Sequence, residues 1–235
     1  SAASDVYKRQ YWNNSGVRRY YIDRYFEKKE YDRVLQVLDE SIELDKAYRG
    51  QVLEYIQKKK EIYRLQGNKS AYIEQLWKLV LEQSAGDLDI YKELKAQYSE
   101  KEWLIKREEL FKKLPPNAHI DRLYKEEKLY DRLLAYVLKS SGLYAVQSYE
   151  NVLKKEYPKQ ILSKYQGEVN KMASCTGNRK HYADLVALLR RMKRIKGGSE
   201  IVETIVEEWK IKYRNRPATV SYTHLRAHET CADLV

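Results

Sequence analysis

Residues suited to nucleophilic or metal chemistry are scarce in this 235-residue chain. The histidines and cysteines are His119, His181, His224, His228, Cys175 and Cys231. Cys175 and His181 lie close in sequence, but they supply two ligands where a structural zinc site needs four. No Ser-His-Asp, Cys-His or paired-carboxylate pattern stands out, and Gly197-Gly198 lacks the lysine and the preceding strand of a phosphate-binding loop. The residues therefore predict no catalytic site, no cofactor and no small-molecule substrate.

A run of cations is the second kind of candidate site. The chain carries a formal net charge of +11, and its densest basic stretch is RRMKRIK, residues 190–196. One interpretation is a surface that contacts the phosphates of a nucleic acid. The other is a solvated helix face near a C-terminus, where cations suit the helix dipole. The candidate contact residues, for phosphate or for a protein partner, are Arg190, Arg191, Lys193, Arg194, Lys196, Arg214 and Arg216. The triplet Lys58, Lys59 and Lys60 adds to the first interpretation.

Tyrosine could also bind nucleic acid, because its ring can stack on a base. The chain holds 22 tyrosines, and most fall on the apolar side of a helical pattern. A tyrosine in that position packs its ring in the core and leaves its hydroxyl at the rim. We therefore expect the tyrosines to be core residues, and Trp77, Trp103 and Trp209 to anchor contacts between helices.

The elements that must position these residues are helices. Gly and Pro are scarce and fall between stretches of helical length. One apolar stripe at helical spacing consists of Tyr130, Leu133, Leu134, Val137 and Leu138, and three other stretches repeat it from Tyr31, Tyr72 and Tyr182. Because strand signals are nearly absent, the sequence predicts an all-α protein of roughly eleven or twelve helices.

An internal repeat indicates how the helices are arranged. The segment YFEKKEYDRVLQVLDES, residues 25–41, aligns without gaps to YKEEKLYDRLLAYVLKS, residues 124–140, with 8 identities in 17 positions. Helix pairs of this kind bury their apolar faces by stacking on neighbouring copies. The predicted fold is a degenerate helical-hairpin repeat, an α-solenoid of the tetratricopeptide or HEAT type. The alternative is a compact helical bundle around one central core.

The two ends of the chain do not follow this pattern. SAASDVYKRQ at the start and VSYTHLRAHETCADLV at the end have no periodicity, and DVYKRQ and VSYTH can be encoded by opposite strands of one short DNA element. This resembles translated sequencing-adaptor DNA, so we expect residues 1–10 and 220–235 to be artefacts. Residues 11–219 would then be an α-helical repeat domain from a longer protein.

Residues from Tyr157 onward carry a resemblance to a known family. Its features are the Tyr157-Pro158 helix start, RKHY before LLRRM within residues 179–192, the Gly197-Gly198 turn and YRNRPA at residues 213–218. Together they resemble the C-terminal helical region of bacterial SWIM zinc finger family proteins. The zinc motif of that family, Cys-x-Cys followed by Cys-x-His, is absent from this sequence. The resemblance therefore implies a zinc module upstream and no zinc-binding residue in this chain.

The expected compartment and function follow from what remains. No apolar run is long enough to cross a membrane, and Cys175 is the one cysteine outside the two ends, so no internal disulfide is expected there. We expect a cytoplasmic protein with no membrane partner. The leading hypothesis is a noncatalytic interaction scaffold that presents a helical surface to a protein partner. The alternative is a basic α-solenoid that binds nucleic acid through its phosphates.

Overall fold

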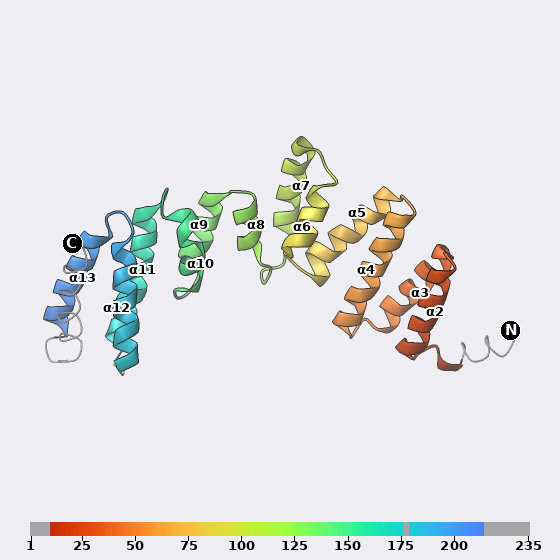
Figure 1. Cartoon of the computed structure of the whole chain (residues 1–235), viewed down its shortest axis with the longest axis horizontal. Helices are drawn as coiled ribbons and strands as arrows, with labels where there is room; N and C mark the ends of the chain where they lie inside the picture. Colours follow the sequence, from red (N-terminus) through yellow and green to blue (C-terminus); the bar gives the residue numbers. More distant parts are fainter. Residues whose placement is uncertain (1–9, 176–178, 214–235) are drawn as a thin grey trace, which may run out of the picture. The chain divides into compact units, whose positions relative to one another are not determined.

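The computed structural model describes residues 10–175 and 179–213, and throughout these ranges the regular structure is helical, without a strand (Figure 1). The described part contains twelve α-helices: α2 (Ser15–Glu27), α3 (Tyr31–Leu44), α4 (Arg49–Leu65), α5 (Lys69–Lys78), α6 (Leu88–Lys95), α7 (Glu100–Lys113), α8 (Ile120–Glu126), α9 (Tyr130–Lys139), α10 (Tyr144–Leu153), α11 (Pro158–Ser174), α12 (Arg179–Lys193) and α13 (Gly198–Lys212). A short π-helix, η1 (Leu79–Gln83), continues α5. The prediction of an all-α fold is confirmed.

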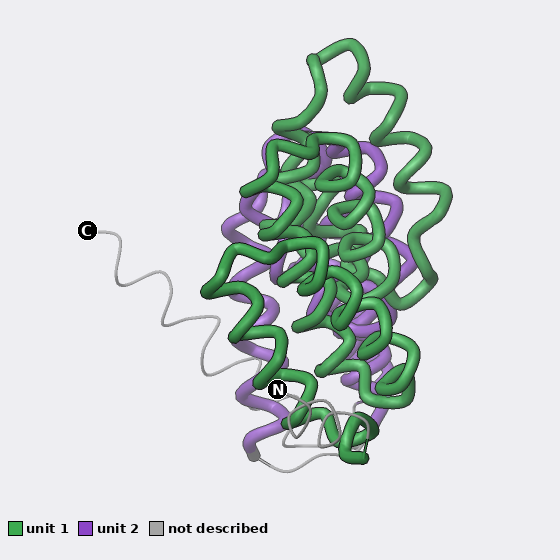
Figure 2. Tube along the Cα trace, turned by 90° about the vertical axis from the view of Figure 1, so that its right-hand side faces the viewer, with its two compact units in different colours: residues 1–127 green, residues 128–235 purple. Residues whose placement is uncertain are grey.

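The chain divides into two compact units, residues 1–127 and residues 128–235, called unit 1 and unit 2 below (Figure 2). In unit 1, α2 packs on α3, α3 on α4, α4 on α5 and α5 on α6. In unit 2, each of the helices α9 to α12 packs on the next, and α11 also contacts α9 and α13. Packing between helices that are adjacent or next but one in the chain is typical of stacked helical hairpins. This is the local arrangement that the sequence repeat predicted.

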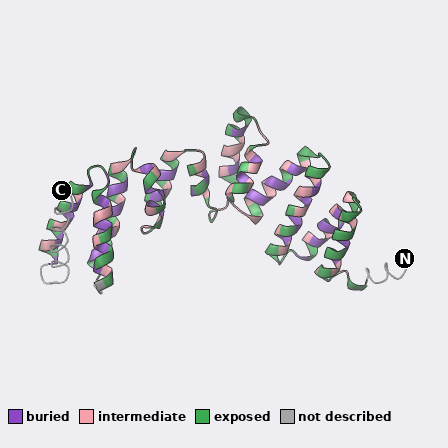
Figure 3. Ribbon diagram, in the orientation of Figure 1, coloured by how far each residue is buried: buried purple, intermediate pink, exposed green. Residues whose placement is uncertain are grey.

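The predicted apolar stripes form the cores of the two units, and buried residues recur along successive helices (Figure 3). In the stripe that begins at Tyr130, the side chains of Leu133, Leu134 and Val137 are buried. Leu138 is 39% exposed, although the spacing placed it on the buried face. It lies in the last turn of α9, and the helical phase alone overestimated its burial.

Trp103 and Trp209 join neighbouring helices, as the sequence predicted, and the half-buried Trp77 of α5 donates from Nε1 to the Tyr98 hydroxyl after α6 at 3.0 Å. Trp103 of α7 is buried, and its ring lies 5.1 Å from that of Tyr91 in α6. Trp209 of α13 is buried, and its Nε1 donates a hydrogen bond of 2.7 Å to Asn170 of α11. Each ring therefore contributes apolar contact, and the indole nitrogen of Trp209 also has a partner.

The two halves of the sequence repeat have the same backbone path. Lys29 and Lys128 occupy equivalent positions in the alignment, and they are the two residues other than glycine with positive φ in the described ranges, at 58° and 54°. Each lies two residues before a helix that begins with tyrosine. A side chain disfavours this left-handed conformation, so its recurrence at one alignment position supports a common ancestry of the two hairpins.

The Gly197-Gly198 pair is explained by the turn between α12 and α13. Gly197 has a φ of 79°, which glycine adopts without the penalty that a Cβ imposes. Gly198 begins α13, and a Cβ at this position would collide with the carbonyl oxygen of Met192 and approach Leu162 of α11. The second glycine is therefore required by the close approach of two backbone segments and not by a ligand.

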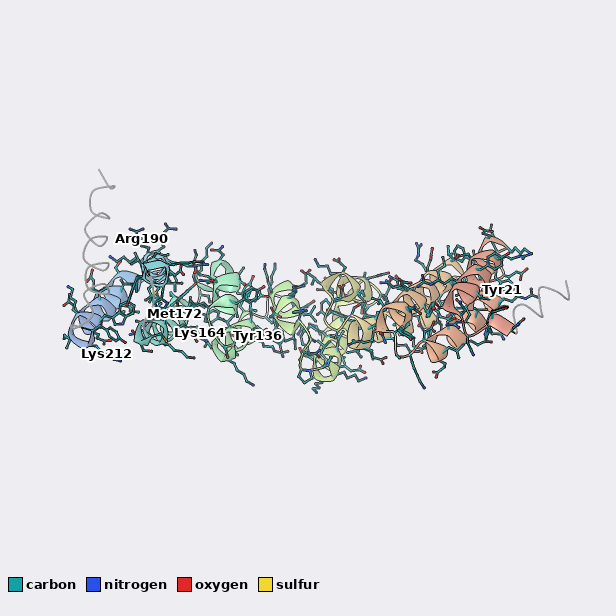
Figure 4. All side chains as sticks on the ribbon, turned by 90° about the horizontal axis from the view of Figure 1, so that it is seen from below. Tyr21, Tyr136, Lys164, Met172, Arg190 and Lys212 are labelled. Atoms are coloured by element: carbon teal, nitrogen blue, oxygen red, sulfur yellow. The ribbon has the colours of Figure 1, made fainter. Side chains whose placement is uncertain are left out.

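The helices of unit 2 lie in two rows. Figure 4 shows Tyr136 of α9, Lys164 of α11 and Lys212 of α13 towards one side of the unit, and Arg190 of α12 towards the other. The contacts of α11 with both α9 and α13 agree with this arrangement. Because successive helices reverse direction (Figure 1), the α10–α11 and α12–α13 turns lie at one edge of the unit, and the α9–α10 turn lies at the opposite edge.

Candidate functional site

The predicted basic run lies partly on α12 and partly in the turn that follows it. One interpretation of the sequence placed the run 190–196 on a helix face, but α12 ends at Lys193 and residues 194–196 lie in the turn after it. Lys193, Arg194 and Lys196 are exposed and form no ion pair with any described residue. Arg190 is half-buried, and its Nε is enclosed without a hydrogen-bond partner in the described part of the chain. The other two predicted contact residues, Arg214 and Arg216, lie outside the described residues.

Arg191 is half-buried and is tied to the neighbouring helix α10. Its Nε donates to the carboxylate of Glu150 in α10, and its Nη2 donates a hydrogen bond of 3.1 Å to the carbonyl oxygen of Gln147. The Tyr165 hydroxyl of α11 donates to the same oxygen of Glu150 at 2.6 Å. One carboxylate therefore joins α10, α11 and α12, and Arg191 differs from its neighbours in the run because its charge is already balanced.

The second basic stretch is also balanced by acids within the fold. Lys58, Lys59 and Lys60 pair with Glu61, Asp39 and Glu93, respectively. The ammonium group of Lys58 also lies over the ring of Phe26, and Lys59 is buried. This triplet looks like a basic patch in the sequence, but its charges are used in contacts between and within helices.

Asp45 joins three helices of unit 1 as Glu150 does in unit 2. It follows α3 and accepts hydrogen bonds from Arg18 of α2 at 2.5 Å and from the hydroxyl of Tyr55 in α4 at 2.7 Å. Both Arg18 and Asp45 are buried. A buried charge is tolerated only when it is paired and hydrogen-bonded, so these contacts are a condition for burying either residue.

Two further carboxylates make the same kind of connection. Glu93 of α6 accepts from Lys60 of α4 and from the Tyr72 hydroxyl of α5. Glu127, after α8, accepts from Lys95 of α6 and from Trp103 and Arg107 of α7. We call Asp45, Glu93, Glu127 and Glu150 the linking carboxylates. Each of the four connects its own helix, or the end of that helix, to two other helices.

The linking carboxylates have lowered pKa values. Burial raises the pKa of Glu150, but hydrogen bonds from Tyr165 and Arg191 outweigh it, and the pKa lies below its usual range. The same balance of burial against donated hydrogen bonds lowers the pKa values of Asp45, Glu93 and Glu127. Burial and the adjacent Glu93 raise the pKa of Tyr72 to about 12. Near neutral pH these carboxylates are therefore ionised, and the phenol of Tyr72 is neutral.

The prediction that tyrosine rings pack in the cores is confirmed for eight tyrosines of the described ranges and wrong for Tyr11, Tyr20, Tyr48 and Tyr144, which are exposed. The expected position of the hydroxyl is also wrong in part. Tyr21, Tyr55, Tyr72, Tyr91, Tyr149, Tyr165, Tyr182 and Tyr213 are buried. The hydroxyls of Tyr55 and Tyr165 are not at the solvent rim, because each donates to a buried carboxylate. A signal for this was present in the sequence: Glu150 lies between Val146 and Leu153 at helical spacing, so it is an acid on an apolar stripe.

The excess positive charge is concentrated in unit 2. Residues 1–127 contain 25 Lys and Arg against 23 Asp and Glu, whereas residues 128–235 contain 20 against 11. The formal net charges are therefore +2 and +9. The run at residues 190–196, with Arg214 and Arg216, supplies part of this excess, and the rest comes from lysines and arginines scattered along the unit.

A shallow hollow of about 420 Å³ lies at the turn between α2 and α3. Its lining residues are Lys29, Glu30, Tyr31, Asp32, Arg33 and Gln66. Cations and acids alternate around it, so its charge favours neither an anionic nor a cationic ligand. At the equivalent turn of unit 2, the Tyr157 hydroxyl donates to Asp131 at 2.6 Å.

The residues with metal-binding chemistry are dispersed. Within residues 10–175 and 179–213, no group of three or more His, Cys, Asp or Glu side chains is placed to hold a metal ion. His181 contacts the carbonyl oxygen of Met172 through Nε2 at 3.0 Å, and Cys175 is exposed. Among the described helices, none combines the length and the apolar character needed to cross a membrane.

Comparisons with known proteins leave the family open. No protein family, curated protein or solved structure was found to match the chain. The resemblance to the C-terminal region of SWIM zinc finger proteins therefore stays a prediction from the residues that carry it.

Proposed function

We propose that this chain is a noncatalytic α-helical interaction scaffold, the C-terminal part of a SWIM zinc finger type protein, which holds a surface out to a protein partner. The observation that carries the proposal is a set of exposed apolar side chains at one edge of unit 2. Tyr144, at the start of α10, is 82% exposed, and Ile211, near the end of α13, is 81% exposed. Leu138, in the last turn of α9, lies at the same edge.

This edge has the composition of a protein-binding surface. Exposed aromatic and aliphatic side chains supply most of the free energy at protein interfaces, where they fill pockets of the partner. Within unit 2, Glu150 and the buried Tyr165 connect α10 and α11 to Arg191 of α12. The scaffold is thereby held in one conformation before a partner binds, which reduces the entropy cost of association.

The proposal is tested by capturing partners with three forms of the full chain. The wild type, a Tyr144→Ser and Ile211→Ser double variant, and a Tyr20→Ser control would be used as baits in a lysate of the source cells. Tyr20 is also exposed, on α2 in unit 1. We expect a reproducible set of proteins that the wild type and the control retain and that the double variant loses. If the double variant retains the same set, this edge does not bind the partner.

A second candidate function is binding of nucleic acid, and a separate observation favours it. Unit 2 has a net charge of +9, and Lys193, Arg194 and Lys196 are exposed without ion pairs to other described residues. Cations that are not balanced internally can neutralise phosphates and release counterions, which drives binding at low salt. An affinity for DNA or RNA that does not fall with rising salt would exclude this function.

A further inference from the structure

Six exposed cations come together along one edge of unit 2, although they are distant in the sequence. They are Lys128 before α9, Lys155 and Lys159 at the α10–α11 turn, and Lys193, Arg194 and Lys196 at the α12–α13 turn. We call this set the basic edge. Only its last three members belong to the run that the sequence revealed. The acids of the same segments are fewer: Asp131, Glu156 and Glu200.

Specific contacts place these segments side by side. The hydroxyl of Tyr157, in the α10–α11 turn, donates to Asp131 in the first turn of α9 at 2.6 Å. A Cβ at Gly198, after the α12–α13 turn, would lie 3.3 Å from Leu162 in the first turns of α11. Figure 1 shows the start of α9 and both turns at the same edge of unit 2. The three segments therefore form one continuous edge.

The charges of the basic edge are available to a ligand. None of the six cations forms an ion pair with a residue in the described ranges, and all six are exposed. Asp131 already accepts a hydrogen bond from Tyr157. Arg191, by contrast, lies two positions before Lys193 in the chain, but its charge is balanced by Glu150. The fold thus separates cations that connect helices from cations that remain free.

The surroundings of the basic edge fit a phosphate backbone better than a protein. Protein interfaces have an apolar core and are depleted in lysine. The large apolar residues exposed on the described part of unit 2, Leu138, Tyr144 and Ile211, all lie at the other ends of their helices. Lysine binds phosphate as a point charge, without a demand for orientation. Neighbouring helices pack roughly 8–10 Å apart. Cations on their turns can therefore contact successive phosphates of an extended nucleic-acid strand.

We propose that the basic edge binds the phosphate backbone of a nucleic acid without reading its sequence, an inference that rests on the second candidate function. Base contacts would be needed for sequence recognition, and the six residues are all cations suited to phosphate. The edge would therefore supply affinity, while any selectivity would come from elsewhere.

The test uses the full chain and two variants with equal changes in net charge. The edge variant carries Lys155→Gln, Lys159→Gln, Lys193→Gln, Arg194→Gln and Lys196→Gln. The control variant carries Lys28→Gln, Lys46→Gln, Lys101→Gln, Lys112→Gln and Lys125→Gln, which are exposed positions in unit 1. Binding of a fluorescent oligothymidylate of about 30 nucleotides would be measured by anisotropy between roughly 25 and 200 mM salt.

We expect the edge variant to bind at least about tenfold more weakly at low salt, and the control variant to stay within about twofold of the wild type. The slope of log affinity against log salt should become shallower by about 0.7 for each phosphate contact that is lost. Equal losses in both variants would mean that total charge, and not the basic edge, determines binding. Unchanged binding by the edge variant would overturn the placement while leaving the second candidate function intact.

If the wild type does not bind at the lowest salt, the second candidate function itself fails. Two further measurements, with poly-glutamate and with an acylating reagent, complete the test. If poly-glutamate binds as tightly and depends on the same five residues, the edge is a docking surface for an acidic protein, and the proposal is wrong. Protection of wild-type lysines from acylation reports on the site without any variant: the oligonucleotide should shield Lys155, Lys159, Lys193 and Lys196 more than Lys28 and Lys46.

Discussion

Individual charged residues in this protein have two distinct uses, and neighbours in the sequence can differ. Arg191 and Lys193 are two positions apart, yet the first is bound to Glu150 and the second is exposed without an ion pair to any described residue. The difference arises because their side chains leave α12 in different directions. Only a side chain on the face towards α10 reaches the buried carboxylate of Glu150. Whether a cation of α12 is paired therefore depends on its position around the helix.

The contrast between Arg191 and Lys193 predicts different effects of the same change. Arg191→Gln leaves Glu150 buried with less compensation and should destabilise the fold by about 1–2 kcal/mol, a value reduced because the arginine is partly exposed. Lys193→Gln should change stability by less than about 0.5 kcal/mol. Chemical denaturation followed by circular dichroism measures both. Equal effects would show that the Glu150 contact contributes nothing to the fold.

The linking carboxylates predict loss of stability in acid. A carboxylate whose pKa is lower in the folded chain stabilises the fold above its unfolded pKa, about 4.3 for Glu, and this contribution is lost as the pH falls through the folded value. The pKa values of Asp45, Glu93, Glu127 and Glu150 are all lowered. The free energy of unfolding should therefore fall below about pH 4.3.

Glu150→Gln serves as the control for this pH dependence. The variant should be less stable than the wild type at pH 7, because Gln cannot balance the charge of Arg191. The difference between the two should shrink as the pH falls, since the wild-type carboxylate is then protonated. Denaturant titrations across the acid range give both curves. A constant difference at every pH would contradict the role assigned to Glu150.

At the scale of helices and turns, the backbone conformation of a few residues explains where successive helices are joined. The repeated left-handed residues Lys29 and Lys128 mark equivalent turns without glycine or proline, so sequence punctuation does not reveal them. Gly67 has the same conformation between α4 and α5, where Asn68 then caps α5 through its side chain. Short turns of this kind set the angle between successive helices and hence the stacking.

Two glycines give opposite predictions for one substitution. Gly198→Ala should destabilise the fold by about 2 kcal/mol or more, because its Cβ would meet the backbone of Met192. Gly167, exposed in the middle of α11, has open space around the position of a Cβ, so Gly167→Ala should stabilise the fold by about 0.5–1 kcal/mol. Thermal unfolding of both variants checks the pair. Tolerance of alanine at residue 198 would mean that the α12–α13 turn is looser than described.

At the scale of the whole molecule, stability is distributed among local contacts. In each unit, the principal helix contacts join helices that are close in the chain. Unit 1 has one cluster of buried residues that draws on α2, α3 and α4, and another that draws on helices from α5 to α8. A protein of this kind loses structure near the site of a perturbation before it loses structure elsewhere.

A single core substitution tests this locality. Leu133 of α9 is fully buried, and Leu133→Ala should destabilise its surroundings by about 3 kcal/mol through the cavity that it leaves. Hydrogen exchange should accelerate in α9, α10 and α11, while α2, α3 and α4 keep their wild-type protection. Uniform acceleration through both units would indicate a single cooperative fold in place of the local stacking inferred from the contacts.

The sequence by itself determined the helical class, most of the buried faces and the presence of a repeat. Helical spacing of apolar residues is a local property, so Leu133, Val137, Trp103 and Trp209 could be assigned to the core from their neighbours in the chain. Its errors include Leu138, in the last turn of α9, and Tyr20, in the middle of α2, which are both exposed.

Only the tertiary structure decided which charges are free. Electrostatic pairing depends on distance in space, and Arg191 and Glu150 are 41 residues apart in the chain, while Lys155 and Arg194 come to one edge through the reversal of successive helices. A basic run in a sequence therefore overstates the available charge where acids of other helices balance it, as at Lys59. It understates that charge where turns from distant segments meet, as they do along the basic edge.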